Sequence, residues 1–412
     1  MAVDWTQLPG DILQSISKKI TVSGDYVKFR AVCPEWRSSL PKFPRHLLRQ
    51  FPWLMIPFSQ SQSHCSFYDL STDVTHVLEL PEAARPDLRI CSSNGWLVIF
   101  DDSPTILLLD PLTGAKLHLP PLSSFPNVVS FDRSKVGKEY AILGDSGDIY
   151  RLSLRQMRDL FIKKIVLSSG PANNDNMVNA LAILGKSNDL ACYKNGDQSW
   201  TFLDNFCLSW CDGIYYKEQF YVVSRDGTIA VCDVNCEMPI ASLIYAFHLF
   251  SVISKMHLVI SGDDELLLIL RNFSIDGKRP DNKLYLKTTG FDVYRMNWGR
   301  QPYWDRVVNL GRRLLFIGEY SSVSLSAYDV RGCVRNPSFS SPYYGQCLGN
   351  CIYFTDDRFV YYGDGTVYVL DRGIYQLRNE KIIAFPGRAR DPHSIWFIPS
   401  TKDENLIADK KI

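Results

Sequence analysis

The sequence predicts a mainly β protein, in which a small N-terminal module of three helices is followed by one large β-propeller. Three observations support this fold class. Helical periodicity is clear in the N-terminal segment before residue 45 and almost vanishes from about residue 64 onward. From residue 64 onward, short apolar runs alternate with clusters of Gly, Asp, Asn, Ser and Pro. Those runs also recur at intervals of about forty residues, a period found in propellers.

The first helix is expected to begin at Pro9 and to continue to Ile20. Proline is tolerated in the first helical turn, and the carboxylate of Asp11 suits the positive end of the helix dipole. The apolar residues that follow recur three or four positions apart, which gives the helix one apolar face. They are Ile12, Leu13, Ile16 and Ile20.

Two further short helices are expected before residue 41. Ser23 and Asp25 open the second helix, and Pro34 ends it. Its apolar positions are Val27, Phe29, Val32 and Cys33. Trp36 begins a third helix, which stops before Pro41. A segment this small holds only a marginal core, so its apolar surface needs cover from elsewhere.

The order of residues in this module resembles an F-box. The residues that carry the resemblance are Leu8, Pro9, Asp11, Ile12, Leu13, Ile16, Ile20, Asp25, Phe29, Val32, Cys33, Trp36 and Arg37. The resemblance implies docking of a Skp-type adaptor through an apolar surface, some of whose residues also hold the helices together. That surface would comprise Leu8, Pro9, Ile12, Leu13, Ile16, Ile20, Phe29, Val32, Cys33 and Trp36. Periodicity alone allows an alternative, a helical cap packed on the body of the same chain.

The body of the chain carries a repeat in which apolar residues precede an Asp. The repeated Asp residues are Asp69, Asp110, Asp233, Asp292, Asp329 and Asp371. Seven blades are the first choice, with six or eight as alternatives. We expect each Asp to form a tight turn by accepting hydrogen bonds from the nearby backbone. Neither a Gly-His…Trp-Asp pattern nor a double-glycine kelch pattern is present.

Strands are expected at the strongest apolar runs. These are Trp96–Phe100, Ile106–Leu109, Phe220–Val223, Leu266–Leu270, Leu314–Ile317, Ile352–Phe354 and Val367–Leu370. Within the body, only Leu154–Phe161 has a helical pattern. The run Ser394–Pro399 is expected to pair with the opening unit around Asp69, which would remove exposed sheet edges. We therefore divide the chain into an F-box at 2–44, a linker at 45–63, a propeller at 64–400 and a tail at 401–412.

The body also resembles the KIB-type propeller of plant F-box proteins. In chain order, the similar segments are FPWLMIP, FYDLSTDVTHVLELP, SSNGWLVIFD, LLLDPLTGAKLHLPPL, NLGRRLLFIG and NCIYFTDD. The two resemblances imply a substrate-recognition subunit of an SCF-type cullin-RING ubiquitin ligase. The adaptor would connect the chain to the cullin, and the propeller would bind a target protein. Ubiquitin transfer would take place on other subunits, so no catalytic residue is expected. The alternative is an F-box interaction protein whose partner is not degraded.

Charge and hydropathy give further expectations about partners and location. The net charge of +1 gives no global reason to expect nucleic acid or an anionic membrane as a partner. Asp4 and Asp11 interrupt the N-terminus, so no signal peptide is expected. The longest apolar run, Ile240–Ser254, is too short to span a bilayer comfortably. We expect a soluble chain of the cytoplasm, the nucleus or both.

The eleven cysteines are expected to be reduced thiols in that compartment. Three pairs have three residues between them: Cys207/Cys211, Cys232/Cys236 and Cys347/Cys351. This spacing permits metal binding, but no histidine lies close enough to complete a set of ligands. Small buried hydrophobic residues are the expected role, and no metal or cofactor is expected.

Substrate-binding residues cannot be assigned from the sequence, and two sets are candidates. The first consists of arginines late in the chain, which would bind an acidic or phosphorylated segment if they converged. They are Arg295, Arg300, Arg306, Arg312, Arg313, Arg331, Arg335, Arg358, Arg372, Arg378, Arg388 and Arg390. The second consists of aromatic clusters, which buried strands explain equally well. They are Tyr215-Tyr216, Pro302-Tyr303-Trp304 and Tyr343-Tyr344.

A propeller enzyme is the competing class of function. Neighbouring carboxylates occur at Asp263-Asp264-Glu265 and at Asp356-Asp357. Adjacent residues of a strand point to opposite faces, and both groups lie beside turn signals, so solvated turns are favoured. The sequence has no nucleophile elbow, P-loop, dinucleotide fingerprint or H-E-x-x-H helix.

Overall fold

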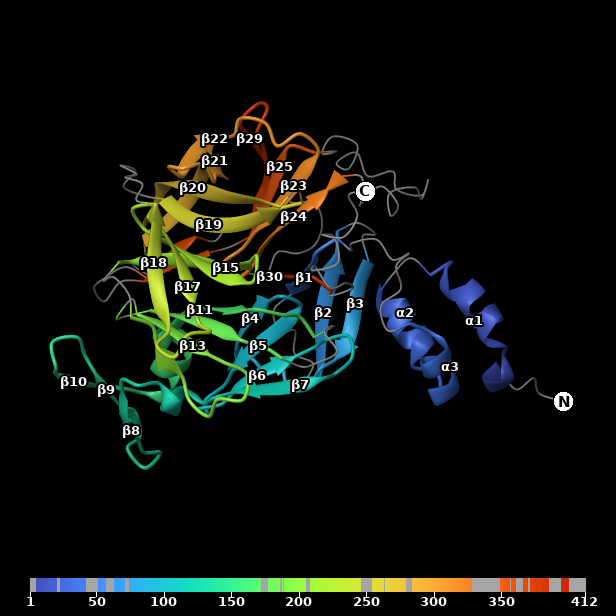
Figure 1. The fold of residues 1–412 in the computed structure, drawn as a ribbon, viewed down its shortest axis with the longest axis horizontal. Coiled ribbons are helices and arrows are strands. Elements are labelled where there is room, and N and C mark those ends of the chain that lie inside the picture. The colour runs from blue at the N-terminus through green and yellow to red at the C-terminus, as the bar shows by residue number, and fades with distance from the viewer. Residues whose placement is uncertain are drawn as a thin grey trace.

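The computed structural model describes most of the chain, from the N-terminal module to the last strand. The described residues are 5–20, 23–41, 51–56, 63–70, 74–171, 177–185, 187, 189–204, 208–245, 254–262, 264–278, 284–327, 349–355, 357–360, 366–369, 371–384 and 394–399. Helices come first along the chain and strands dominate the rest, as predicted (Figure 1).

Three short α-helices make up the N-terminal module. After a 3₁₀ turn, η1 (Trp5–Gln7), they are α1 (Gly10–Ser17), α2 (Ser23–Arg30) and α3 (Pro34–Ser39). The first two predicted helices are confirmed, although both end earlier than expected. The third begins at Pro34, and the predicted start at Trp36 is wrong. Cys33 precedes it as the N-cap, with its Sγ accepting a hydrogen bond from the Trp36 amide at 3.4 Å. Proline suits the next position because it has no N–H to leave unpaired.

Six of the sheets in the described chain are arranged as blades around a common axis, which confirms the predicted propeller (Figure 1). Six was an alternative to the first choice of seven. From the axis outward, blade 1 contains β30 (Ile395–Phe397), β1 (Trp53–Ile56), β2 (His64–Asp69) and β3 (Val74–Glu79). Blade 2 contains β4 (Arg89–Ser93), β5 (Trp96–Phe100), β6 (Ile106–Leu109) and β7 (Lys116–Leu119).

Blades 3 and 4 are also four-stranded antiparallel sheets. Blade 3 contains β11 (Ile162–Leu167), β12 (Ala180–Leu184), β13 (Leu190–Tyr193) and β14 (Thr201–Phe202). Blade 4 contains β15 (Trp210–Tyr216), β16 (Gln219–Ser224), β17 (Ile229–Asp233) and β18 (Ile240–Tyr245). The alternation of short apolar runs and turns therefore gives regular meanders in this part of the chain.

Blades 5 and 6 are larger and share a hairpin. Blade 5 contains β19 (Ser254–Ser261), β20 (Glu265–Lys278), β21 (Leu284–Asn297), β22 (Tyr303–Arg306), β27 (Thr366–Val369) and β26 (Asp357–Val360). Blade 6 contains β24 (Ser322–Ser326), β23 (Arg313–Ile317), β25 (Cys351–Phe354), β28 (Gly373–Gln376) and β29 (Lys381–Ala384). Strands β26 and β27 leave blade 6 between β25 and β28, and β27 pairs in parallel with β21.

The C-terminal strand closes the ring, as predicted. β30 pairs with β1, where Trp53 lies opposite Phe397, and β1 pairs with β2, which ends at Asp69. Because β1 lies inside the predicted linker at 45–63, the first blade begins at Trp53 and not at residue 64. The predicted tail at 401–412 lies outside the described residues.

A seventh sheet lies outside the ring (Figure 1). It contains β8 (Val128–Phe131), β9 (Tyr140–Leu143) and β10 (Ile149–Leu152), and it falls between blades 2 and 3 in the sequence. The ring does not need this sheet for closure, since β4 and β11 are in direct contact. Arg89 of β4 donates to the carbonyl oxygens of Ile162 at 2.6 Å and Lys163 at 3.0 Å.

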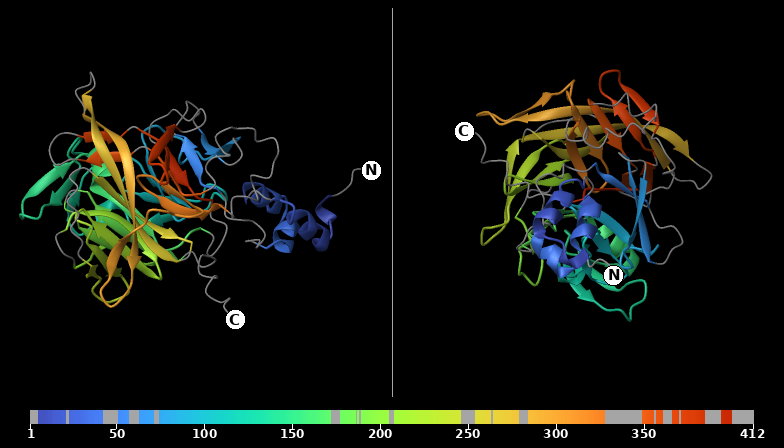
Figure 2. Two further views of the ribbon diagram at one scale, coloured as in Figure 1. Left: turned by 90° about the horizontal axis from the view of Figure 1, so that it is seen from above. Right: turned by 90° about the vertical axis from the view of Figure 1, so that its right-hand side faces the viewer.

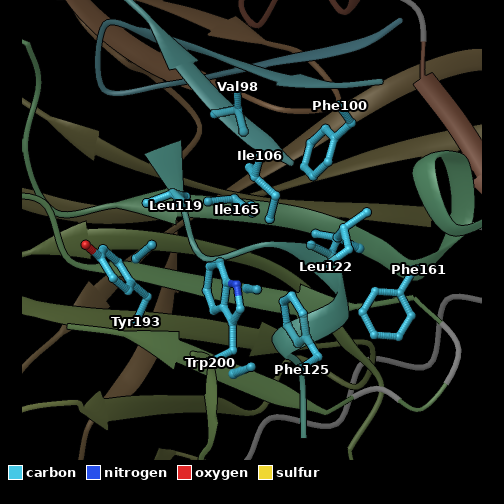
Figure 3. Close-up of a cluster of buried hydrophobic side chains, with 14 of the residues drawn as sticks. Val98, Phe100, Ile106, Leu119, Leu122, Phe125, Phe161, Ile165, Tyr193 and Trp200 are labelled. Atoms are coloured by element: carbon cyan, nitrogen blue, oxygen red, sulfur yellow. The ribbon is translucent and has the colours of Figure 1, made fainter. Parts of the chain in front are cut away.

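A large buried apolar cluster joins blades 2 and 3 to the β8–β10 sheet (Figure 3). Phe125 stacks on Trp200 with ring centroids 4.7 Å apart, and the Trp200 indole donates to the carbonyl oxygen of Pro120 at 3.0 Å. Phe125 follows a short turn, η2 (Leu122–Ser124). The predicted helical segment is confirmed as α4 (Leu154–Gln156) and the π-helical turn η3 (Met157–Phe161).

The repeated Asp residues only partly follow the predicted turn role. The Oδ1 atoms of Asp110 and Asp233 accept hydrogen bonds from the amides of Leu112 at 3.0 Å and Asn235 at 2.9 Å, which are tight turns of the expected kind. Asp329 lies outside the described residues. The remaining members include residues that link strands or blades.

Buried charges link neighbouring blades. Lys164 of β11 forms an ion pair with Asp212 of β15, whose Oδ2 accepts the Leu258 amide of β19 at 2.8 Å. Between blades 5 and 6, Arg271 is fully buried and its Nη2 lies 2.8 Å from Asp371 Oδ1. Asp371 therefore neutralises a buried guanidinium, and its predicted turn role is wrong. A buried charge is tolerated only when it is paired in this way.

Candidate docking site

The helical module has a small core of its own. Leu13, Trp36 and Leu40 are buried against one another, with exposed fractions of 1%, 7% and 3%. Leu8, Phe29 and Cys33 are partly buried and pack against this core. Of the ten predicted docking residues, five therefore contribute to holding the three helices together. Figure 2 shows these helices beside the propeller and not among its blades.

Trp36 is a structural residue of this core. Its ring lies 4.7 Å from the ring of Phe29, and its indole Nε1 donates to the carbonyl oxygen of Trp5 at 3.1 Å. A tryptophan held on both its apolar face and its polar edge is well ordered. The sequence presents Trp36 as an aromatic anchor of the docking surface, whereas the structure buries it within the module.

Two polar contacts join α2 to the end of α3. The Tyr26 hydroxyl donates to the carbonyl oxygen of Pro41 at 2.7 Å, and Arg30 Nε donates to that of Leu40 at 3.1 Å. Tyr26 is 1% exposed, and its burial raises the pKa of the phenol, although the nearby Arg30 opposes the shift. Tyr26 lies off the predicted apolar pattern of α2, so the sequence alone assigns it no role.

Two apolar side chains of α1 are exposed. Ile12 and Ile16 are 44% and 39% exposed, while Leu13 and Ser17 on the same helix are buried. Residues four apart in a helix lie one above the other, so the two isoleucines form a continuous stripe. Pro9, three residues before Ile12, is exposed at the start of that stripe. We call Pro9, Ile12 and Ile16 the α1 stripe.

Two more large apolar side chains of the module are exposed. Trp5 is 64% exposed and Val32 is 57% exposed. Val32 was predicted as a docking residue and Trp5 was not. The Trp5 backbone is fixed by its bond from Trp36, so its ring is presented from an ordered position. A tryptophan so close to Leu8-Pro9 was the available signal in the sequence. Ile20, the remaining predicted residue, is half-buried.

Two of the late arginines are paired with carboxylates in the structure. Arg295 lies 3.0 Å from Glu265 and 3.5 Å from Asp305, and Arg306 lies 2.8 Å from Asp292. Carboxylates of the same blade therefore neutralise these two guanidinium groups. Four members of the predicted set lie outside the described residues: Arg331, Arg335, Arg388 and Arg390.

Two of the predicted aromatic candidates belong to the propeller core. Tyr216 and Trp304 are 4% and 6% exposed, and both pack in the cluster between blades 4 and 5. Tyr215 is half-buried, whereas Tyr303 is 47% exposed. The pair Tyr343-Tyr344 lies outside the described residues. Burial in strands thus explains Tyr216 and Trp304 better than a role in a recognition surface.

The carboxylates proposed for an enzyme site form surface ion pairs. Asp264 lies 3.0 Å from Lys217, and Glu265 lies 3.0 Å from Arg295. Asp263 and Asp356 lie outside the described residues. In the part of the chain that the structure describes, no three His, Cys, Asp or Glu side chains are grouped to hold a metal ion.

The described cysteines lie mainly within strands. Cys192 and Cys232 are 1% exposed, and burial raises the pKa of both thiols, to about 11 for Cys192. Burial also raises the pKa of Cys211. Cys207 and Cys347 lie outside the described residues.

Within the described part of the chain, no helix combines the length and apolar character needed to cross a bilayer.

Comparison with known proteins agrees with this architecture. The family model of the KIB1-4 beta-propeller matches residues 67–376. The chain belongs to this family. It is 25% identical over 404 residues to F-box protein SKIP23 of Arabidopsis thaliana, which covers 92% of this chain and 91% of that protein. It is 27% identical over 366 residues to F-box protein At2g17036 of the same plant, covering 82% and 83%. The chain is thus a plant-type F-box protein with a KIB-type propeller.

Proposed function

We propose that this chain is the substrate-recognition subunit of an SCF-type cullin-RING ubiquitin ligase. The observation that carries the proposal is the apolar α1 stripe on a module whose core is already complete. Isolated exposed apolar residues are ordinary, but a continuous exposed stripe is typical of an interaction surface. The F-box names of the relatives support a Skp-type adaptor as the partner.

In this proposal, the ten predicted docking residues divide into three groups by burial. The α1 stripe and Val32 contact the adaptor directly, together with Trp5. Leu13 and Trp36 act indirectly, because they fix the helices that present the stripe. Leu8, Ile20, Phe29 and Cys33 are half-buried and border both regions.

The propeller supplies the second half of the function, which is to hold a target protein. Ring closure by β30 and the buried ion pairs between blades make it a rigid platform. The adaptor connects this platform to the cullin, and ubiquitin transfer occurs on other subunits. We accordingly propose no catalytic residue in this chain. The proposed location, in the cytoplasm, the nucleus or both, rests on the sequence alone.

The experiment is a co-purification of the full chain with a Skp-type adaptor and a cullin. The test variant is Ile12→Asp with Ile16→Asp, which places charge on the α1 stripe. The matched control is Met238→Asp with Val308→Asp, which changes two propeller residues that are 80% and 73% exposed. Wild type and control are expected to retain adaptor and cullin, and the test variant to lose both.

Two outcomes would count against the proposal. Folded wild-type protein that binds no adaptor would contradict it. Equal binding by the test variant and the control would show that the stripe is not the docking surface. A protein bound by the propeller can also be followed in cells. If its abundance is the same with the wild type and with the test variant, the second candidate is favoured, which is an F-box interaction protein whose partner is not degraded.

A further inference from the structure

The sheet outside the ring carries a turn with unusual charge. We call residues 132–139, which join β8 to β9, the basic hairpin; all eight are described. Arg89 links β4 directly to β11, so the propeller closes without the sheet that bears this hairpin. Figure 1 shows β8, β9 and β10 projecting away from the blades. The segment therefore adds a surface and is not needed to complete the ring.

Positive charge dominates the exposed side chains of the basic hairpin. Arg133, Lys135 and Lys138 are all exposed. The carboxylate on this surface is that of the half-buried Asp132, whose Oδ2 lies 3.4 Å from the Lys135 ammonium. Between the lysines, Val136 is 89% exposed. The turn thus presents three cations and an apolar side chain to solvent, against one carboxylate.

The second carboxylate of the hairpin points inward. Glu139 is 6% exposed, and its two oxygens accept the amides of Gly137 at 2.8 Å and Leu154 at 3.1 Å. Burial alone would raise the pKa of Glu139, but these backbone hydrogen bonds outweigh it and the pKa is lowered. The side chain is therefore ionised at neutral pH. Its negative charge is directed at backbone amides and not at the surface of the hairpin.

These contacts also fix the shape of the hairpin. Lys135 donates its amide to the Asp132 carbonyl at 3.2 Å, and Lys138 donates to the Lys135 carbonyl at 2.8 Å. Gly137 has a φ of +81°, a conformation that glycine adopts without strain. A preorganised loop loses little conformational entropy when it binds, so its charges act from a defined position.

We infer that the basic hairpin docks an acidic segment of the protein that the propeller recognises; the inference rests on the proposed function. Charge complementarity selects an acidic partner. Arg295 and Arg306 of the late set are paired with carboxylates of their own blade, which leaves these two less available to an acidic partner than the exposed cations of the hairpin. A polypeptide is favoured over nucleic acid, because three cations and an apolar apex make few phosphate contacts.

The test measures binding of the full chain to a fluorescein-labelled peptide of ten glutamates, by anisotropy. The test variant replaces all three cations: Arg133→Gln, Lys135→Gln and Lys138→Gln. The matched control makes the same change in net charge on blades 5 and 6: Lys287→Gln, Arg378→Gln and Lys381→Gln. A labelled single-stranded RNA of ten nucleotides is the competing probe. Circular dichroism verifies the fold of both variants.

We expect the test variant to weaken peptide binding at least fivefold, and the control to change it less than twofold. Added salt should weaken wild-type binding, since exposed charges are screened. Equal losses in both variants, or no loss, would overturn the inference. So would RNA binding tenfold tighter than the peptide. Adaptor binding should be unchanged in the test variant, so a failure here is separable from a failure of the proposed function.

Discussion

The sharpest test of the docking site is the double substitution Ile12→Ala with Ile16→Ala. Full burial of an isoleucine side chain is worth about 1.5–3 kcal/mol. Ile12 and Ile16 are 44% and 39% exposed, and only this exposed part of each side chain can be buried by an adaptor. An alanine at the same position still offers part of that area for burial. The loss is then about 1.5 kcal/mol, or about a tenfold increase in the Kd for the adaptor.

The same substitutions should leave the module folded. Both side chains point away from the Leu13–Trp36 core, and surface substitutions usually change the free energy of unfolding by less than about 0.5 kcal/mol. Leu13→Ala is the contrasting variant. It removes a side chain that is 1% exposed, at a cost of about 2–5 kcal/mol, which a module of this size cannot absorb.

Two measurements separate these effects. Isothermal titration calorimetry gives the Kd for the adaptor, and hydrogen exchange over residues 5–20 reports the folding of α1. We expect the double variant to lose affinity with unchanged exchange, and Leu13→Ala to lose protection as well as affinity. Faster exchange in the double variant, or adaptor binding within twofold of wild type, would refute the division into core and stripe.

Three further predictions concern the rest of the molecule. Asp212→Ala leaves Lys164 buried without its counter-ion and should lower the free energy of unfolding by about 3–5 kcal/mol, as measured by denaturant titration. The double variant Asp212→Leu with Lys164→Met should lose less free energy of unfolding than the sum of the two single changes. Trp396→Ala removes a side chain that is 1% exposed, together with the hydrogen bond that its Nε1 donates to the Ile317 carbonyl at 3.1 Å. We expect the free energy of unfolding to fall by about 3–5 kcal/mol and the Tm to fall with it. An unchanged Tm would argue against ring closure through β30. The pKa of Glu139 is lower in the folded protein than in the unfolded chain, so its ionised carboxylate stabilises the fold above the unfolded pKa. This stabilisation is lost as the pH falls through the folded pKa. Hydrogen exchange should therefore show less protection of the Gly137 and Leu154 amides on acidification, with a smaller decrease in Glu139→Gln.

Strands and closure could be predicted from the sequence because local patterns determine them. The apolar runs Trp96–Phe100 and Ile106–Leu109 coincide with β5 and β6. Closure at Ser394–Pro399 followed from the need to cover the edge of the first sheet. The helices of the module were recognised from periodicity and from residues that start helices.

What the sequence could not decide was which apolar side chains face inward. Periodicity places Ile12, Leu13 and Ile16 on α1 but does not tell the core side from the outer side. Trp36 was therefore weighed as an interface residue, although its indole bond to Trp5 lies inside the module. That bond joins residues 31 positions apart, which no local pattern encodes.

Long-range pairing also explains the errors in the propeller. Asp371 resembles a turn residue in the sequence, but in the structure it forms an ion pair with the buried Arg271 of β20. The described chain has six blades and not the seven of the first choice, because the β8–β10 sheet adds strands between blades 2 and 3 but lies outside the ring. The passage of β26 and β27 from blade 6 to blade 5 leaves no signal in local composition.

The most direct test of the central claim is hydrogen exchange of the full chain with and without a purified Skp-type adaptor. We expect new protection within residues 5–20, centred on the α1 stripe, and unchanged exchange across blades 2 to 6. Absence of binding by folded protein would contradict it, as would protection confined to the propeller.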